Sequence, residues 1–216
     1  DASYEAADEW ITIVKRLWTE ERDFDFEGKY FRTRQAHLMP KPLQKPHPVV
    51  VNAGQSAVGR RFGAKHADFS FQTLPDLESL KGMIDDTRKI ARSEYKRDIG
   101  ILIHAYVVCR DTEKEALDYV KYYVDERGDW EAAESLISIL VGSKEEGFPL
   151  DRIREMQRAF IAGWAGYPLV GTPEQIVEKI QALSRIGVAG AALHWVNFEA
   201  GIKQFNEKIL PLMVQA

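Results

Sequence analysis

The chain has 216 residues, a hydrophobic fraction of 45%, a charged fraction of 29% and a formal net charge of −4 at pH 7. This length is enough for one domain with a sizeable core, and the composition is typical of globular proteins rather than disordered ones. The mild negative charge argues against a nucleic-acid-binding surface and against a polybasic membrane patch.

The composition also bears on the compartment. No apolar run approaches the ~20 residues that a membrane span needs, and no signal-peptide pattern opens the chain. Cys109 is the only cysteine, which excludes an internal disulfide and fits a reducing environment. These features predict a soluble, cytoplasmic protein.

The N-terminal quarter combines a helix with a proline-rich segment. The following apolar residues recur at helical spacing and predict an amphipathic helix with both tryptophans in the core: Ala7, Trp10, Ile11, Val14, Leu17 and Trp18. Residues 24–31 are polar and aromatic and predict a short hairpin or loop. Four prolines between Pro40 and Pro48 forbid helix, and they predict an extended lead-in to a buried strand.

From residue 49 onward, strand and helix patterns alternate. Strands are predicted at 49–53, 68–73, 99–109 and 189–196, and helices at 56–66, 77–95, 112–141 with a break near Gly128, 150–162, 172–186 and 198–213. The third and fourth strands are almost continuously apolar, as in parallel sheets that are covered on both faces. Thr172-Pro-Glu-Gln175 is a capping-box sequence. The pattern predicts an α/β protein with a parallel sheet.

Four strands are half the number found in a (β/α)8 barrel, which needs about 250 residues. We therefore predict that residues 1–216 form about half of such a barrel, with a helical insertion at about 112–171. A half-barrel leaves two open sheet edges, so a homo-oligomer is also expected.

The clearest local signal is the predicted strand at 49–53 running into Gly54-Gln55-Ser56 and then a helix. A helix N-terminus after a parallel strand offers free N–H groups and a positive dipole end, which suits phosphate. The alternative is that Ser56 only caps the helix. No Walker lysine follows, and the spacing does not fit G-x-G-x-x-G.

Other catalytic patterns are weaker. Gly54-x-Ser56-x-x-Gly59 is similar to a hydrolase nucleophile elbow, with His194 available as the histidine, but the second glycine is one residue late. The five histidines show no metal-binding spacing. His104 and His194 lie in predicted strands, where they either contact substrate or are satisfied core groups. Cys109 ends an apolar strand and is predicted to be a buried, inert thiol.

Several stretches together resemble the bacterial luciferase-like flavin-dependent monooxygenases, in particular the dimethylsulfone, pyrimidine and alkanesulfonate branches. The stretches are Tyr4–Trp10, Val14–Trp18, Phe26–Phe31, Pro40–Pro48, Asn52–Ser56, Phe62–Asp68, Gly163–Ile176 and Gly201–Leu212. Their order covers essentially the whole chain and matches the C-terminal half of that family.

The resemblance implies a TIM-type barrel, reduced FMN delivered by a separate flavin reductase, and molecular oxygen. A flavin C4a-(hydro)peroxide would oxygenate a small organic substrate, a sulfone or sulfonate. It also implies that Gly54, Gln55 and Ser56 form the phosphate loop and that Tyr4 reaches the flavin phosphate or ribityl side. The family's remaining flavin contacts and most of its catalytic groups lie in strands that precede this chain, so no catalytic residue is assigned.

The resemblance further places a mobile segment between Cys109 and Thr172, where Trp164 and Tyr167 would belong to a lid; the alternative is a helical surface insertion. Trp195 joins these residues as a substrate candidate. Three other functions stay open: a pyrimidine-type ring-opening oxygenase, a deazaflavin-dependent oxidoreductase of the same superfamily, and a non-catalytic half-barrel that binds a phosphate ligand or a partner.

Overall fold

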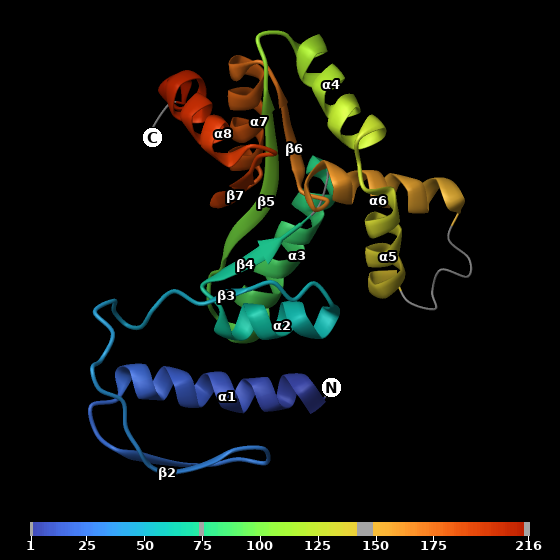
Figure 1. Cartoon of the computed structure of the whole chain (residues 1–216). Helices are drawn as coiled ribbons and strands as arrows, with labels where there is room; N and C mark the ends of the chain where they lie inside the picture. The colour runs from blue at the N-terminus through green and yellow to red at the C-terminus, as the bar shows by residue number, and fades with distance from the viewer. Residues whose placement is uncertain (1, 74–75, 142–148, 214–216) are drawn as a thin grey trace. The chain divides into compact units, whose positions relative to one another are not determined.

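The computed structural model describes residues 2–73, 76–141 and 149–213 (Figure 1). The chain divides into two compact units. Unit 1 comprises Asp1–Phe71 and Asp85–Gly100, and unit 2 comprises Gln72–Ile84 and Ile101–Ala216. Each unit is described by itself.

Unit 1 contains the N-terminal helix, the hairpin and the first parallel strand pair. Its elements are α1 (Ala2–Thr19), β1 (Phe24–Glu27), β2 (Arg32–Ala36), β3 (Val51–Asn52), α2 (Ala57–His66), most of β4 (Phe69–Gln72) and the second half of α3 (Leu77–Tyr95). Strands β1 and β2 pair antiparallel, which confirms the predicted hairpin. Strands β3 and β4 pair parallel, as predicted, although β3 is only two residues long.

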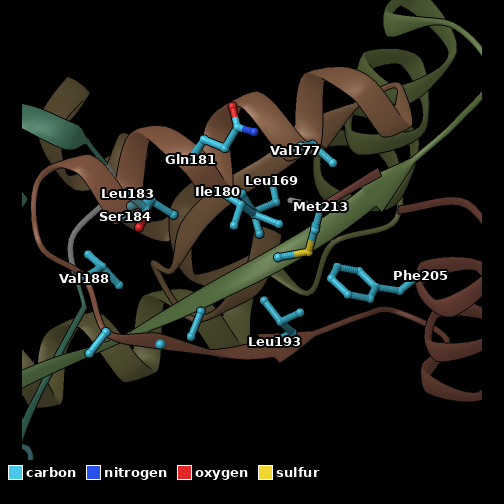
Figure 2. A pocket seen from close by; sticks show the side chains of 13 residues that line it. Leu169, Val177, Ile180, Gln181, Leu183, Ser184, Val188, Leu193, Phe205 and Met213 are labelled. Atoms are coloured by element: carbon cyan, nitrogen blue, oxygen red, sulfur yellow. The ribbon is translucent and has the colours of Figure 1, made fainter. Parts of the chain in front are cut away.

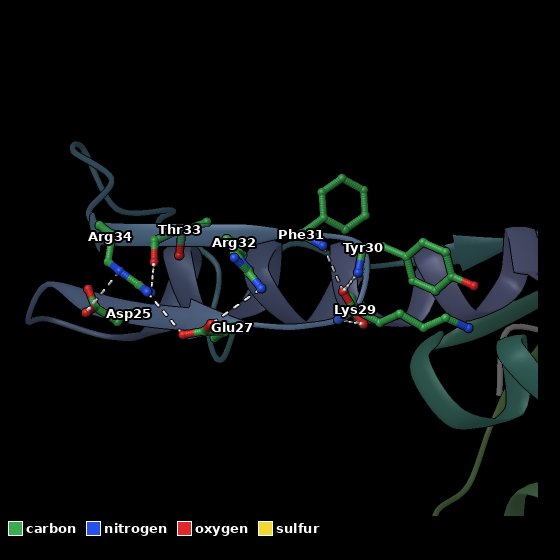
Figure 3. Close-up of polar contacts among 9 residues, drawn as sticks. Asp25, Glu27, Lys29, Tyr30, Phe31, Arg32, Thr33 and Arg34 are labelled. Carbon is green, nitrogen blue, oxygen red and sulfur yellow. Dashed lines mark hydrogen bonds and ion pairs between the residues drawn. The ribbon is translucent and has the colours of Figure 1, made fainter.

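The hairpin is attached to α1 through a single carboxylate. Glu9 accepts hydrogen bonds from the backbone N–H groups of Lys29, Tyr30 and Phe31 at 2.8–3.0 Å. A Cβ at Gly28 would overlap this carboxylate, so glycine permits the close approach. Across the hairpin, Glu27 forms ion pairs with arginines of β2 (Figure 3). These polar contacts, together with the burial of Phe24 of β1 beneath Arg16, therefore hold this element.

The prediction that Trp10 lies in the core is wrong, because its side chain is 53% exposed. Helix α1 contacts α2 through the side that carries Asp8 and Lys15. It contacts the hairpin through the side that carries Glu9. At 100° per residue Trp10 falls on the remaining side, which neither element covers. Helical periodicity identified the helix correctly but not the faces that are buried.

Unit 2 is built around three parallel strands and their helices. Its elements are β5 (Gly100–Cys109, except Gly100), α4 (Glu113–Lys121), the π-helical turn η1 (Tyr122–Glu126), α5 (Trp130–Val141), α6 (Leu150–Gly163), β6 (Tyr167–Gly171), α7 (Pro173–Arg185), β7 (Gly190–His194), α8 (Phe198–Gln204), η3 (Phe205–Ile209) and η4 (Leu210–Leu212). The predicted break in the long helix near Gly128 is confirmed, since α5 begins at Trp130. The predicted strand at 189–196 is confirmed as β7.

Strand β5 pairs in parallel with both β6 and β7 (Figure 1). Strand β6 was not predicted; its residues were assigned to the helical insertion. Its five residues include Pro168, which cannot donate a ladder hydrogen bond, and this weakens the local strand signal. The expected insertion therefore ends in a strand rather than in a loop or helix.

The side chains of β5 alternate between two environments. Ile101, Ile103 and Ala105 are fully buried in the main core, together with side chains from the first half of α3 and from α7. The intervening residues, including His104 and Tyr106, are half-buried on the opposite face of the strand. Around Val108 a second core forms with α4, η1 and α6. This alternation separates the face that meets the main core from a second face, which carries His104 and, toward its end, packs Tyr106 and Val108 in the second core.

The predicted capping box at the start of α7 is confirmed. The Thr172 hydroxyl accepts from the Gln175 N–H, and the Gln175 side chain accepts from the Thr172 N–H. We predict that Thr172→Ala lowers the free energy of unfolding by about 1 kcal/mol. Thr172→Ser keeps the hydroxyl and should cost much less. Urea denaturation of both variants provides the measurement, and equal stability of Thr172→Ala and wild type would contradict the capping role.

Candidate functional site

The first group of candidate residues lies in unit 1, where β3 leads into α2. The Ser56 hydroxyl accepts the Gly59 N–H at 3.1 Å, so Ser56 is the N-cap of α2. The Gly54 N–H donates to the Asn52 side-chain oxygen at 3.0 Å. Gln55 and Ser56 are both exposed. The capping interaction is therefore present, and it leaves the hydroxyl proton of Ser56 able to donate to a ligand.

Tyr4 of α1 lies against this loop. A Cβ on Gly59 would lie 2.6 Å from the Tyr4 hydroxyl oxygen, and a Cβ on Gly54 would lie 3.0 Å from it. Any larger residue at Gly59 would displace the tyrosine. The structure thus brings together all four residues expected to hold the flavin phosphate: Tyr4, Gly54, Gln55 and Ser56.

A cavity of about 500 Å³ opens beside Tyr4 and is lined in part by Lys29, Arg61 and Lys65. Each of these cations is paired: Lys29 with Glu5, Arg61 with Glu94 and Lys65 with Asp8. The carboxylates offset the positive charge of the cavity wall. An anion at this end of α2 would therefore depend on loop N–H groups and the helix dipole rather than on side-chain cations.

A second layer of contacts lies next to Tyr4 and was not predicted. The Phe62 ring lies 5.6 Å from the Tyr4 ring and 5.1 Å from the His66 ring. His66 Nε2 is 2.7 Å from the carboxylate of Asp8. Burial lowers the pKa of His66, while the hydrogen bond to Asp8 opposes this shift. Tyr4 and Asp8 are four residues apart on α1, so one helix face carries both, but their partners are more than fifty residues away in sequence.

The second group of candidates lies in unit 2 on the polar face of β5 and β7. His194 is in register with Tyr106, and His104 with Ala192, so both histidines share one face of the sheet. Their ring centroids are 5.8 Å apart. Burial lowers the pKa of both, and the positive charge of His194 lowers that of His104 further. Both imidazoles are thus kept neutral near pH 7, when each can donate one hydrogen bond and accept another.

Trp164 is brought to His104 by the turn after α6. Its backbone hydrogen-bonds His104, and its side chain is 59% exposed. A Cβ on Gly166 would lie 2.9 Å from His104 Nδ1, so this turn passes directly over the imidazole. Trp164 has a left-handed backbone (φ 53°), an uncommon conformation for a bulky residue.

Tyr167 and Trp195 lie elsewhere. Tyr167 was expected in a lid, but it lies in β6 with its side chain buried in the main core. It is a packing residue because β6 pairs with β5 at this point. Trp195 follows β7, packs against the Phe198 and Phe205 rings and borders the same core.

The remaining sequence-based expectations concern the cysteine, metals and membranes. Cys109 is buried, and burial raises the pKa of its thiol, as expected for an inert cysteine. Within residues 2–73, 76–141 and 149–213, no three histidine, cysteine or acidic side chains are grouped so that they could hold a metal ion. In the same part of the chain, no helix is long and apolar enough to cross a membrane.

Comparison with known proteins identifies the family. Residues 1–190 match the model of the luciferase-like monooxygenases. The chain belongs to this family.

Two relatives and one solved structure illustrate the similarity. The chain is 31% identical to the FMNH2-dependent dimethylsulfone monooxygenase of Pseudomonas putida, covering 99% of this chain and 59% of that protein. It is 28% identical to the pyrimidine monooxygenase RutA of Acinetobacter baylyi, covering 97% and 57%. The crystal structure of a long-chain alkane monooxygenase (LadA) superposes with a TM-score of 0.82 at 23% identity, covering 97% and 55%. The chain therefore spans less than three fifths of the length of these proteins.

The proximity of the two strand histidines gives a testable pH effect. Because His194 carries a like charge when protonated, His194→Gln should raise the pKa of His104 toward its ordinary value. NMR titration of the His104 imidazole in wild type and variant measures this shift. An unchanged His104 pKa would mean that the two rings do not interact as the structure places them.

The same pKa shift predicts how stability depends on pH. The pKa of His104 is lower in the folded state than in the unfolded chain, which has an ordinary value of about 6.5. As the pH falls below about 6.5, the unfolded state binds more protons than the folded state, so the free energy of unfolding decreases. His104→Gln should flatten this decrease in urea denaturation between pH 7.5 and 5. An equally steep decrease in the variant would contradict the assignment.

Proposed function

We propose that this chain is the C-terminal part of a reduced-FMN-dependent monooxygenase that acts on a small organic substrate, a sulfone or sulfonate. The observation that carries this proposal is the loop Gly54-Gln55-Ser56 at the start of α2, with the Tyr4 hydroxyl packed on it, in a chain of this family. Glycines 54 and 59 let the Tyr4 hydroxyl approach the loop backbone closely, and the loop lies at the N-terminus of α2, where free N–H groups suit a phosphate group.

In this proposal the loop binds and orients the cofactor. The N–H groups around Gln55 and Ser56 and the dipole of α2 hold the phosphate, and the Tyr4 hydroxyl donates to the phosphate or ribityl side. Reduced flavin, delivered by a separate flavin reductase, supplies the electrons with which oxygen is activated. On the polar face of unit 2, the neutral imidazoles of His104 and His194 offer hydrogen bonds to a substrate. The exposed Trp164 ring covers it and limits the access of water.

The proposal includes a barrel to which this chain contributes five strands, β3, β4, β5, β6 and β7, one more than the sequence predicts. Among the strands of the described ranges, β7 pairs only with β5. Its sequence, Gly-Ala-Ala-Leu-His, lacks the charge or proline that protects a free edge. An apolar cavity of about 380 Å³ lies beside it, lined by residues that include Leu183, Val188, Leu193 and Phe205 (Figure 2). A further strand, from a longer protein or a second copy of the chain, would complete the sheet there.

A second candidate function within the family is oxidation of a pyrimidine-like ring, because a pyrimidine monooxygenase is almost as similar in sequence as the dimethylsulfone enzyme. A deazaflavin-dependent reaction would use the same fold with another cofactor. Titration with reduced FMN and with a deazaflavin separates that alternative, and turnover of dimethylsulfone against uracil separates the two oxygenases.

The phosphate loop gives the sharpest test. In a protein that carries the complete barrel, Ser56→Ala removes one hydrogen bond to a charged group, worth roughly 1.5–3 kcal/mol. The affinity for FMN should therefore fall about ten- to a hundredfold. Ser56→Thr retains the hydroxyl and should bind nearly as well as wild type.

Riboflavin provides the ligand control, because it lacks the phosphate and its binding should be insensitive to Ser56→Ala. If Ser56 serves only as a helix cap, Ser56→Ala should instead cost about 1 kcal/mol of stability and leave FMN affinity unchanged. That outcome in a flavin titration would contradict the assigned loop.

A further inference from the structure

A separate cavity lies where β5 and β7 end. It has a volume of about 310 Å³ and is lined by the last residues of β5, by Tyr119 of α4, and by residues between Trp195 and Gln204. All of these belong to unit 2. The carboxyl ends of parallel strands are the usual location of ligand sites in α/β folds. The volume is at the lower end of the range for small-molecule cavities.

Arg110 is the only cation among the residues that line this cavity, and no acidic residue lines it. Its guanidinium carbon lies 3.9 Å from the centre of the Tyr119 ring. One guanidinium N–H donates to the Cys109 carbonyl oxygen at 2.7 Å, and the Arg110 backbone N–H donates to the Gly171 carbonyl oxygen at 3.1 Å. These contacts fix the position of the side chain and leave most of its five N–H donors available.

Arg110 has no ion-pair partner in the part of the chain that the structure describes. The neighbouring carboxylate of Asp111 is instead paired with Lys208 at 2.9 Å. Nearby, the side-chain oxygen of Asn197 accepts the Ala200 N–H, which leaves the amide NH2 of Asn197 as a donor. Gln204 adds a second amide to the lining. The cavity therefore combines an unpaired positive charge, neutral donors and two aromatic side chains.

We propose that this cavity binds the anionic group of a small organic oxyanion, with Arg110 as its charge partner and Tyr119 and Trp195 as the apolar walls. Guanidinium groups match planar and tetrahedral oxyanions through paired N–H donors. The cavity is distinct from the Gly54–Ser56 loop, which lies in unit 1, and neither His104 nor His194 lines it. As a statement about the substrate, this proposal rests on the proposed function. It selects an organic sulfonate or carboxylate over a neutral sulfone.

Two small ligands of nearly equal shape test the charge requirement. Methanesulfonate and dimethyl sulfone differ by one oxygen anion in place of one methyl group, and both carry a methyl signal suited to ligand-observed NMR. Titration into the 216-residue chain at constant ionic strength should show binding of methanesulfonate and at least tenfold weaker binding of dimethyl sulfone. Equal affinity for both, or no binding of methanesulfonate, overturns the proposal.

Variants then locate the site. Arg110→Gln should weaken methanesulfonate binding at least tenfold, and Arg110→Lys, which retains the charge, should weaken it less. Arg127→Gln is the matched control, because Arg127 also stacks on a tyrosine, Tyr122, but does not line the cavity. It should leave binding unchanged. An equal loss in Arg127→Gln, or no loss in Arg110→Gln, would assign the anion to nonspecific surface charge.

Two further readouts keep the result interpretable. Circular dichroism of each variant checks that it is folded. If Arg110→Gln does not fold, the binding measured with Arg110→Lys provides the test. Inorganic phosphate is then added as a competitor. A general oxyanion site should bind phosphate as tightly as methanesulfonate, whereas a site that also contacts the organic group should bind methanesulfonate more tightly. FMN binding is measured separately, so a failure here leaves the flavin proposal intact, and a failure of FMN binding leaves the anion measurement valid.

Discussion

The parallel strand β5 is the constraint on which unit 2 depends. Its alternate side chains Ile101, Ile103 and Ala105 are fully buried, and this fixes which face of the strand meets the helices. A shift of one residue would send His104 into the apolar core, where an unsatisfied imidazole is costly. The register with β7 then sets His194 on the same face, and the pairing with β6 carries Gly166 across His104. Arg110 follows the last residue of β5 and lines the cavity at the end of β5 and β7.

The parts of the fold that depend on residues close together in the sequence could be predicted. Thr172 and Ser56 cap their helices through residues three positions away. The nearly continuous apolar sequence of residues 100–109 predicts a buried strand. The parts that depend on distant contacts could not. Strand β6 is defined by pairing with β5 rather than by its own composition. The exposure of Trp10 follows from where the hairpin attaches, and that attachment depends on Glu9 and N–H groups about twenty residues away.

The candidate site shows the same division. The loop at Gly54 could be predicted because a strand, a glycine and a helix cap follow one another in sequence. The place of Tyr4 at this loop was predicted from the family resemblance. The contact between His66 and Asp8 next to it was not predicted, because the two residues are 58 positions apart and share no motif. The proposed role of Arg110 was also not predicted. A single arginine after a strand forms no recognisable sequence pattern. The proposal depends on the fact that no carboxylate among the described residues is paired with Arg110.

The two anion-binding candidates use different physics. Around Tyr4 every cation that lines the cavity is paired, so the local field comes mainly from backbone N–H groups at the start of α2, which suit a phosphate whose position must be fixed. At the end of β5, the carboxylate of the next residue, Asp111, is paired with Lys208, and the Arg110 guanidinium lies over the Tyr119 ring. A half-buried guanidinium without a counter-charge has a desolvation cost that an incoming anion relieves. That cost is in keeping with the proposed role, because an acidic neighbour would satisfy Arg110 within the fold and would compete with an incoming anion.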